Sequence, residues 1–515
     1  MRLRSQRQSR QLAHDGPPFD GSCPIERVPT LILAYIFGFV LIDHVDNWWS
    51  SCKAVCRGAR LSNRWIGRIM VVCRRWHDIV IHTPRLWTYI AIDEEREISD
   101  ISLYQERSRV LPCHVYVMNG TRNIFENVAR YSSRIKELYC LFDERRDLSA
   151  LDAFRSPAPI LESLSIHVKY EGAETETLSP IFNGQMPNLR KLTLIPFAYT
   201  PGNEFRNLTH LRLENQMDST WNMNDFMTLL EANPNLEQLH MFAASPAPVP
   251  EFSRFVHLPQ LRVWYLCWHD WQQMLRILTC VGIPPTAQLI IRDVREEPGA
   301  SISDSFPENI SHLMNLETLT RLRVEHYNRN IDVLALAARG TATLRYDTGG
   351  YAEESLYLTN TWHDIGRILP LARITELWIS VDCDSLRQWS QLNALLWKDV
   401  FSRMTSVRQI CITGPCLGNA VAALNAQESL SCPQLRNLTW IDPSNDAHNI
   451  IPLVLHDRPG LSVRLLYDRT TPGQDFYQGN KQVTVETGVP RTKRPRMRPS
   501  KEAVSLHDGG YNLLL

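Results

Sequence analysis

The chain has 515 residues, of which 44% are hydrophobic and 21% are charged. This composition is too apolar for a disordered protein, and at about 150 residues per domain the length predicts three or four domains or one long array of repeats. The 55 basic side chains are matched by 55 acidic ones. The whole chain therefore has no field that would draw it to nucleic acid or to a membrane.

The cysteines indicate the cellular compartment, and the longest apolar run indicates whether the chain spans a membrane. Twelve cysteines occur without regular spacing, and no secretory signal peptide precedes them. Free thiols in a reducing compartment explain this pattern, so we expect an intracellular protein of the cytoplasm, the nucleus or both. The longest apolar run, Leu31 to Ile42, has 12 residues, whereas a helix that spans a bilayer needs about 20. We therefore expect no membrane partner.

The first 92 residues predict a polar arm followed by a small helical module. Residues 1–22 contain four arginines and a Gly-Pro-Pro sequence, which is typical of a disordered basic arm. Residues 28–42 and 65–82 predict helices, the second because its apolar residues recur at offsets of three, four and seven. Thr83-Pro84 ends that helix, since proline disfavours helical geometry in the residue before it. We assign residues 23–92 to the module, with an insertion at about 43–63, and residues 93–129 to a linker.

From about residue 130 the sequence repeats the pattern L-x-x-L-x-L, often with a proline two places before the first leucine. Thirteen copies have a mean step of about 27 residues and individual steps from 19 to 33. Nine start at Leu161, Leu189, Leu208, Leu236, Leu261, Leu319, Ile374, Val407 and Leu435, and four weaker ones start near Ile135, Ala287, Thr341 and Leu461. This motif and this period are typical of leucine-rich repeats. We expect residues 130–470 to form an irregular leucine-rich-repeat solenoid, an α/β horseshoe.

The repeat pattern also predicts which side chains point outward. The second and third apolar positions of each copy lie two residues apart on one face of a short strand, so the residue between them points to the opposite, open face. Stretches between copies, such as residues 224–232, have helical spacing and would form a second layer. We expect a target protein to bind at the exposed strand positions Arg190, Lys191, Thr193, Arg212, Gln238, His240 and Arg323. Their mixed charge favours a folded protein over a polyanion.

Residues 471–515 lose the repeat pattern and gain glycine, proline, lysine and arginine, which predicts a disordered tail. Residues 491–515 hold six basic and two acidic side chains, which leaves 49 basic against 53 acidic over residues 1–490. Prolines keep the basic run at 491–501 extended. Three alternative roles are compatible with this basic run: a nuclear-import signal, a weak nucleic-acid contact, or no role beyond a solvated tail.

Two N-terminal segments resemble the F-box, in the form found in fungal F-box-like proteins. Residues 25–37 are similar to the leucine-proline start and Ile-Leu-x-x-Ile-Phe helix of that family, with Leu31 where the family usually has glutamate. Residues 72–87 match its V-C-R-x-W and P-x-L-W motifs. The resemblance covers about 70 residues, and the repeats that follow match the usual arrangement of an F-box with leucine-rich repeats.

The resemblance implies a substrate-receptor subunit of an SCF-type ubiquitin ligase. Such a subunit binds a Skp-family adaptor, and through it the cullin and RING subunits, by burial of apolar side chains rather than by catalysis. The adaptor-binding residues that the resemblance implies are Pro29, Ile32, Leu33, Ile36, Phe37, Val72, Cys73, Trp76, Leu86 and Trp87. It implies no cofactor and no enzymatic activity of the chain itself.

The sequence also has to be weighed against a scaffold role, a zinc site and enzymatic activity. A repeat scaffold with a degenerate F-box and no ligase role is the main alternative, because Leu31 and the insertion depart from the family pattern. Cys52, Cys56, Cys73 and His77 have the spacing of a zinc set, although Cys73 already belongs to the F-box motif. The sequence has no phosphate-binding loop, nucleophile elbow or metalloprotease helix. We therefore expect no bound metal and no catalysis.

Overall fold

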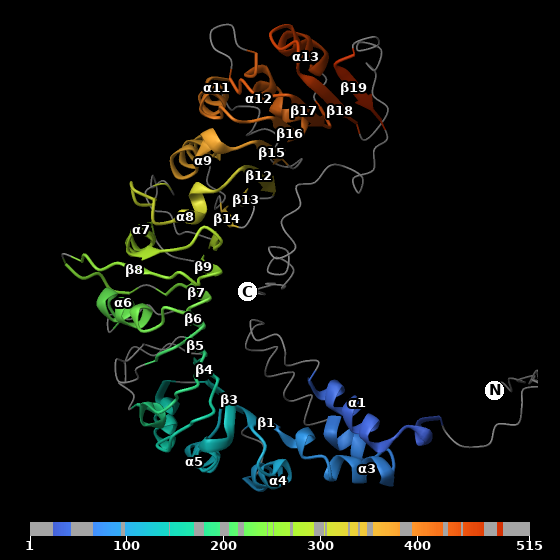
Figure 1. The fold of residues 1–515 in the computed structure, drawn as a ribbon, viewed down its shortest axis with the longest axis vertical. Coiled ribbons are helices and arrows are strands. Elements are labelled where there is room, and N and C mark those ends of the chain that lie inside the picture. The colour runs from blue at the N-terminus through green and yellow to red at the C-terminus, as the bar shows by residue number, and fades with distance from the viewer. Residues whose placement is uncertain are drawn as a thin grey trace, which may run out of the picture. The chain divides into compact units, whose positions relative to one another are not determined.

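A computed structural model of the chain gives the fold, and Figure 1 shows it as a ribbon. The structure describes residues 24–42, 65–93, 98–143, 145–168, 180–195, 205–214, 221–244, 246–250, 252–267, 271–292, 303, 306–327, 330–337, 340–347, 354–381, 394–425, 431–443, 446–467 and 481–487. The chain divides into two compact units. The N-terminal unit comprises Met1–Ala91 and Ser99–Cys113, and the C-terminal unit comprises Ile92–Ile98 and His114–Leu515.

The N-terminal unit is mainly helical. Its elements are η1 (Pro24–Arg27), α1 (Thr30–Ile42), a helical segment at 65–70, α3 (Arg74–Ile81), η2 (Pro84–Trp87), the start of β1 (Tyr89–Asp93) and most of α4 (Ile98–Ser108). The indole of Trp87 anchors the unit, because its Nε1 donates a hydrogen bond to the Val80 carbonyl at 2.8 Å. Its ring lies 5.1 Å from that of Tyr104 on α4, and the Arg107 guanidinium lies 4.3 Å from its centre.

Two predictions for this region are wrong. The helix predicted at 65–82 is broken at residues 71–73, where Val71 is 83% exposed and Cys73 has an extended backbone before α3 begins. Two adjacent β-branched valines lower helix propensity here, which favours the break. The linker predicted at 93–129 contains α4, β2 (Cys113–Met118) and α5 (Arg122–Ala129). Its apolar residues Val115, Val117 and Phe125 are buried, and a solvated linker has no such burial.

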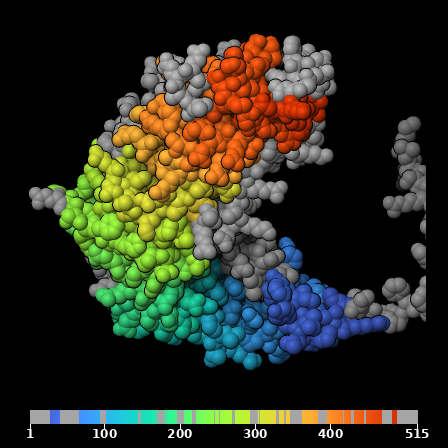
Figure 2. Space-filling model, turned by 45° about the horizontal axis from the view of Figure 1, so that its top comes forward, coloured from blue at the N-terminus to red at the C-terminus, as the bar shows by residue number. Residues whose placement is uncertain are grey.

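The C-terminal unit is a mixed α/β structure with a large, mostly parallel sheet. A strand begins at each of the thirteen expected repeat positions or within two residues after it, which confirms the strands predicted from the pattern. The strands are β3 (Ile135–Phe142), β4 (Ser163–Val168), β5 (Lys191–Ile195), β6 (His210–Glu214), β7 (Gln238–Phe242), β9 (Val263–Cys267), β11 (Gln288–Arg292), β12 (Arg321–Tyr327), β14 (Thr341–Asp347), β15 (Glu376–Val381), β16 (Gln409–Thr413), β17 (Asn437–Ile441) and β18 (Ser462–Leu466). Figure 2 shows the same order at the surface of this unit, where the colours follow one another from teal to red.

The register of the strands places the repeat leucines in continuous rows. Leu164, Leu192, Leu211 and Leu239 lie directly opposite one another on β4 to β7, and all four are fully buried. A second row two residues later has the same property. It consists of Ile166, Leu194, Leu213 and Met241. Because side chains alternate along a strand, these rows define the core face of the sheet, and the residues between them define its open face.

Strand β13 was not predicted, and it changes the strand order. β13 (Asn330–Leu336) pairs antiparallel with both β12 and β14, whereas the neighbouring strands run parallel. The order along the sheet is therefore β11, β14, β13, β12, β15, and β12 and β14 appear in reverse of their chain order. We call residues 321–347 the antiparallel insert.

Helices cover the core face of the sheet (Figure 1). They are α5, α6 (Met223–Glu231), α7 (Trp271–Cys280), α8 (Met314–Glu317), α9 (Glu354–Ile368), α11 (Ala394–Arg403), α12 (Gly418–Ala422) and α13 (Ala447–His456). Short 3-10 helices are η3 (Ser132–Arg134), η4 (Arg145–Ala153), η5 (Ile181–Gly184), η7 (Leu371–Arg373) and η9 (Pro415–Leu417). A small separate sheet pairs β8 (Val256–His257) with β10 (Val281–Gly282).

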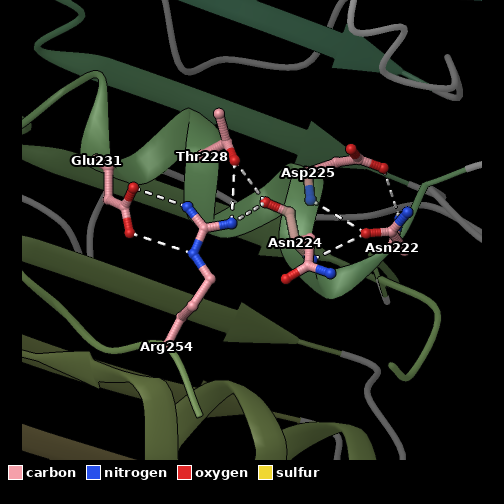
Figure 3. Close-up of polar contacts among 6 residues, drawn as sticks. All are labelled: Asn222, Asn224, Asp225, Thr228, Glu231 and Arg254. Atoms are coloured by element: carbon pink, nitrogen blue, oxygen red, sulfur yellow. Dashed lines mark hydrogen bonds and ion pairs between the residues drawn. The ribbon is translucent and has the colours of Figure 1, made fainter. Parts of the chain in front are cut away.

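Helix α6 illustrates how a repeat helix is fixed, and it confirms the helix predicted at 224–232 (Figure 3). Asn222 accepts hydrogen bonds from the backbone of Asn224 and Asp225, and Asp225 accepts one from the backbone of Asn222, which forms a capping box. At the other end, both carboxylate oxygens of Glu231 accept from the Arg254 guanidinium, at 2.7 and 3.3 Å. Arg254 therefore attaches the segment before β8 to this helix.

The disordered tail predicted at 471–515 is wrong for its middle part. Residues Val483–Glu486 form β19, which extends the sheet parallel to β18. The carboxylate of Glu486 accepts two hydrogen bonds from Arg464, at 2.7 and 2.9 Å. Alternation of Val483 and Val485 with polar residues explains the strand, since these valines lie opposite the buried Val463 and Leu465. The basic run at 491–501 lies outside the described residues.

Within the ranges given above, no helix combines the length and the apolar character needed to cross a bilayer. Seven cysteines whose side chains the structure describes are free thiols: Cys73 is exposed, and Cys113, Cys140, Cys267, Cys280, Cys411 and Cys432 are buried.

Candidate protein-binding surfaces

Helix α1 is apolar on every side, and this feature creates the first candidate surface. Its sequence, TLILAYIFGFVLI, contains no charged residue. The helix begins just after Pro29, whose carbonyl accepts a hydrogen bond from the Leu33 amide at 3.1 Å. A helix that is apolar all round is normally buried on all sides, so an exposed side of α1 calls for a partner.

The inner side of α1 belongs to the core of the N-terminal unit. Leu33 and Phe37 are one turn apart and are only 1% and 3% exposed. The ring of Phe37 lies 4.8 Å from that of Trp76 on α3. The Arg75 guanidinium, also on α3, donates a hydrogen bond to the Val28 carbonyl just before α1. These contacts fix the orientation of α1 and determine which of its side chains face outward.

The outer side of α1 is an exposed apolar stripe. Leu31 is 80% exposed, Ile32 49%, Tyr35 62%, Ile36 45% and Phe39 60%. Their spacing of three, four and eight residues places them on one side of the helix, and the Tyr35 and Phe39 rings are in edge-to-face contact at 4.8 Å. We call these five residues the α1 outer face. A contiguous apolar patch of this kind on a folded unit usually marks an interaction site.

The ten expected adaptor-binding residues are therefore not all on the surface. Pro29, Ile32, Ile36, Val72 and Cys73 are exposed, and Trp76 is half-buried. The expectation is corrected for Leu33, Phe37, Leu86 and Trp87, which are 1–3% exposed and form the core of the unit. A partner cannot reach these four side chains without unfolding the unit.

On α1 and just before α3, four further apolar residues are exposed that the sequence pattern did not single out, namely Leu31, Tyr35, Phe39 and Val71. The signal that could have found three of them is the absence of any polar residue after Thr30 in α1, because such a helix has more apolar surface than one packing interface can bury. Leu31 stands where the F-box pattern usually has glutamate, and it is the most exposed of the five residues of the α1 outer face.

The second candidate surface is the open face of the sheet in the C-terminal unit. Of the seven expected target-binding residues, Arg190, Lys191, Arg212, Gln238 and Arg323 are half-buried on this face or just before it. The expectation of exposure is wrong for Thr193 and His240, which are 5% and 7% exposed. A large neighbour explains the burial of His240, because Tyr265 stacks against its ring with centres 5.5 Å apart.

Rings and ion pairs make the open face rigid. The Tyr139 ring lies 4.7 Å from that of His167 on the next strand. Arg212 pairs with Glu214, and Arg323 pairs with Glu325, in both cases two residues further along the same strand and therefore on the same face. Such pairs hold long side chains in one orientation, so a partner meets a largely preformed surface.

Burial also sets the charge of two histidines on this face. Burial lowers the pKa of His240 to about 3, and electrostatic interactions with Arg212 and, when it is protonated, with His210 act in the same direction. Burial lowers the pKa of His210 to about 4, with further contributions from Lys191 and Arg262. Both imidazoles are therefore neutral at pH 7. For Glu137, burial acts to raise the pKa, but the hydrogen bond and charge of His114, with Lys191 and Lys136, outweigh it and lower the pKa.

The possible zinc set is only partly within the described residues. Cys73 is exposed and precedes α3, and His77 lies one turn later on that helix. Cys52 and Cys56 lie outside the described residues. Among the residues that the structure does describe, no three His, Cys, Asp or Glu side chains come together in a way that could hold a metal ion.

Comparison with models of known protein families found no match, and comparison with curated proteins found no match either.

Proposed function

We propose that this chain is a substrate-receptor subunit of an SCF-type ubiquitin ligase, in which an F-box-like module binds a Skp-family adaptor and a leucine-rich-repeat solenoid binds the target. The adaptor connects the chain to the cullin and RING subunits. The chain itself makes no covalent bond. It supplies proximity and orientation between the target and the ubiquitin-charged enzyme.

The observation that carries the proposal is the α1 outer face. It lies on the helix whose sequence resembles the first F-box motif, and it exposes five apolar side chains on one side. Fully burying a large apolar side chain contributes about 1.5–3 kcal/mol, so a few of these residues suffice for a stable helix-in-groove contact. The register of the repeat leucines supports the second half of the proposal, since stacked parallel strands with helices on one face are typical of leucine-rich repeats.

The test is co-purification of the full chain with a Skp-family adaptor. We expect a stable complex with the unmodified chain and its loss in an Ile36→Asp variant, because the aspartate places a charge within the apolar contact. Val110→Asp is the matched control, since Val110 is 86% exposed in the same unit and lies outside α1. Substitution of Phe37 would not separate loss of contact from loss of fold, because that side chain is in the core.

The outcomes separate the proposal from its alternative. A complex that is lost in the Ile36 variant and retained in the Val110 variant supports the receptor role. No complex with the intact, folded chain leaves a repeat scaffold with a degenerate F-box and no ligase role. The exposed Leu31 is the observation that favours this alternative, because the family usually has a glutamate there.

A further inference from the structure

Positive charge gathers on five adjacent strands of the open face. The described residues of β5, β6, β7, β9 and β11, with the residue before each strand, hold five arginines or lysines and two glutamates. The basic residues are Arg190, Lys191, Arg212, Arg262 and Arg292. The glutamates are Glu214, which pairs with Arg212, and Glu237, whose carboxylate is 3.6 Å from Arg262. These strands therefore have an excess of positive charge in a chain whose total charge is zero.

The sheet register brings these charges together. Lys191 on β5 lies directly opposite His210 on β6, and Arg212 on β6 lies directly opposite His240 on β7. Next along the sheet, Tyr265 on β9 stacks on His240, and the Arg292 guanidinium of β11 lies 6.0 Å from the centre of the Tyr265 ring. We call Lys191, His210, Arg212, His240, Arg262 and Arg292 the basic strip.

The electrostatic effects among these side chains agree with the geometry. Lys191 and Arg262 both disfavour a proton on His210, and Arg212 does the same for His240. Their positive fields therefore overlap at the centre of the strip. A bound anion would be attracted to several of these groups at once, which is the condition for charge complementarity at an interface.

We propose that the basic strip binds an extended acidic segment of the target protein, about six residues long. Four steps of about 4.8 Å between neighbouring strands separate β5 from β11, a span of about 19 Å that six extended residues cover. A nucleic acid is the less suitable ligand, because Glu214 and Glu237 interrupt the strip and would repel a continuous phosphate backbone.

This inference deepens the proposed function, since the acidic segment would belong to the ubiquitination target. The probe is fluorescein-labelled hexaglutamate, with hexaglutamine and a short oligothymidylate for comparison, measured by fluorescence anisotropy with the full chain. We expect hexaglutamate to bind most tightly and to weaken between about 50 and 300 mM salt, because salt screens exposed charges. A double variant, Lys191→Glu and Arg262→Glu, should weaken hexaglutamate binding about tenfold or more.

Arg436→Glu is the matched control. Arg436 is exposed and precedes β17 at the place where Arg262 precedes β9, so it tests charge reversal elsewhere on the same sheet. Circular dichroism confirms that each variant is folded. Equal binding of hexaglutamine or oligothymidylate, or an equal loss in Arg436→Glu, would overturn the inference. Adaptor co-purification should be unchanged in the double variant, so that failure here is distinguishable from failure of the proposed function.

Discussion

Arg458 is a buried cation that joins backbone segments of neighbouring repeats. It is 6% exposed, and its guanidinium donates hydrogen bonds to the carbonyls of Leu424 at 3.1 Å, of Cys432 at 2.9 Å and of Ser431. Burial lowers its pKa, and the nearby Cys432 and Asp457 act against that shift. All three acceptors are main-chain groups that water cannot easily reach, so the side chain has a structural role.

We expect Arg458→Met to lower the free energy of unfolding by about 2–4 kcal/mol, because it leaves three carbonyls without a donor. Urea unfolding followed by circular dichroism measures the change. Arg436→Met is the control and should change the stability by less than about 0.5 kcal/mol, since Arg436 is exposed. An equal effect of both substitutions would contradict the structural role of Arg458.

The buried His240 and the half-buried His210 on the open face predict how stability depends on pH. The folded-state pKa values, about 4 for His210 and about 3 for His240, lie below the ordinary value of 6.5. The unfolded chain therefore takes up protons first as the pH falls. The contribution of these two groups to stability is present above pH 6.5 and is lost as the pH falls from 6.5 towards 4 for His210 and towards 3 for His240.

Melting temperatures measured between about pH 7.5 and pH 4.5 test this expectation. The double variant His210→Gln and His240→Gln should lose less stability on acidification than the unmodified chain does. His363→Gln serves as the control, because His363 is exposed on α9 and lies outside the open face. If the double variant has the same pH dependence as the control, these imidazoles do not contribute in this way.

At the scale of elements, the sequence predicted the strands of the repeat region and the helix that became α6. Most strand copies contain two large apolar residues two apart, and burying such a pair favours one strand face strongly enough to fix the register. Asn222 and Asp225 flank the start of α6 with capping side chains, which adds a local signal to the helical spacing. In both cases, the residues that the sequence pattern marks as apolar are the ones that the fold buries.

Two features escaped prediction, namely which side of α1 is buried and the presence of β13, because the local sequence pattern does not determine either of them. In α1, apolar side chains occur at every position around the helix, so spacing alone cannot assign Phe37 to the core and Ile36 to the surface. In β13, the sequence NIDVLAL has strand character, but it lacks the repeat motif and pairs antiparallel. Contacts with Trp76 and with β12 and β14 decide these cases, and they depend on distant parts of the chain.

Removal of β19 should change the hydrogen exchange of the neighbouring strand β18. A chain that ends after Tyr467 lacks β19, and we expect faster amide hydrogen exchange in β18. The Val463 amide donates to the Gln482 carbonyl at 2.7 Å, and the Tyr467 amide donates to Glu486 at 2.9 Å, so both lose their acceptors. Hydrogen exchange read by mass spectrometry measures this. Exchange in β4 should be unchanged, and unchanged exchange in β18 would contradict a structural role for β19.

At the scale of the whole molecule, the stacked repeats predict that a destabilising substitution affects mainly the strands next to it. Each strand pairs mainly with its immediate neighbours, as in one-dimensional arrays whose stability is a sum of neighbouring interfaces. We expect Leu239→Ala, at a fully buried position on β7, to lower the free energy of unfolding by about 2–5 kcal/mol. Amide hydrogen exchange should become faster mainly in β6, β7 and β9.

Adaptor co-purification of this variant should be retained, since α1 belongs to the other unit. Loss of that complex would show that the two units unfold together.

The antiparallel insert has a consequence for synthesis on the ribosome. The neighbour of β11 on its far side is β14 rather than β12, so the edge of β11 stays unpaired until Thr341–Asp347 has emerged. At about 5–20 residues per second, translation of the chain between β11 and the end of β14 takes roughly 3–10 seconds. During that interval the nascent chain presents an open strand edge to chaperones and to other chains. A slow stretch of messenger RNA within this interval would prolong that exposure, and one placed after β14 would not.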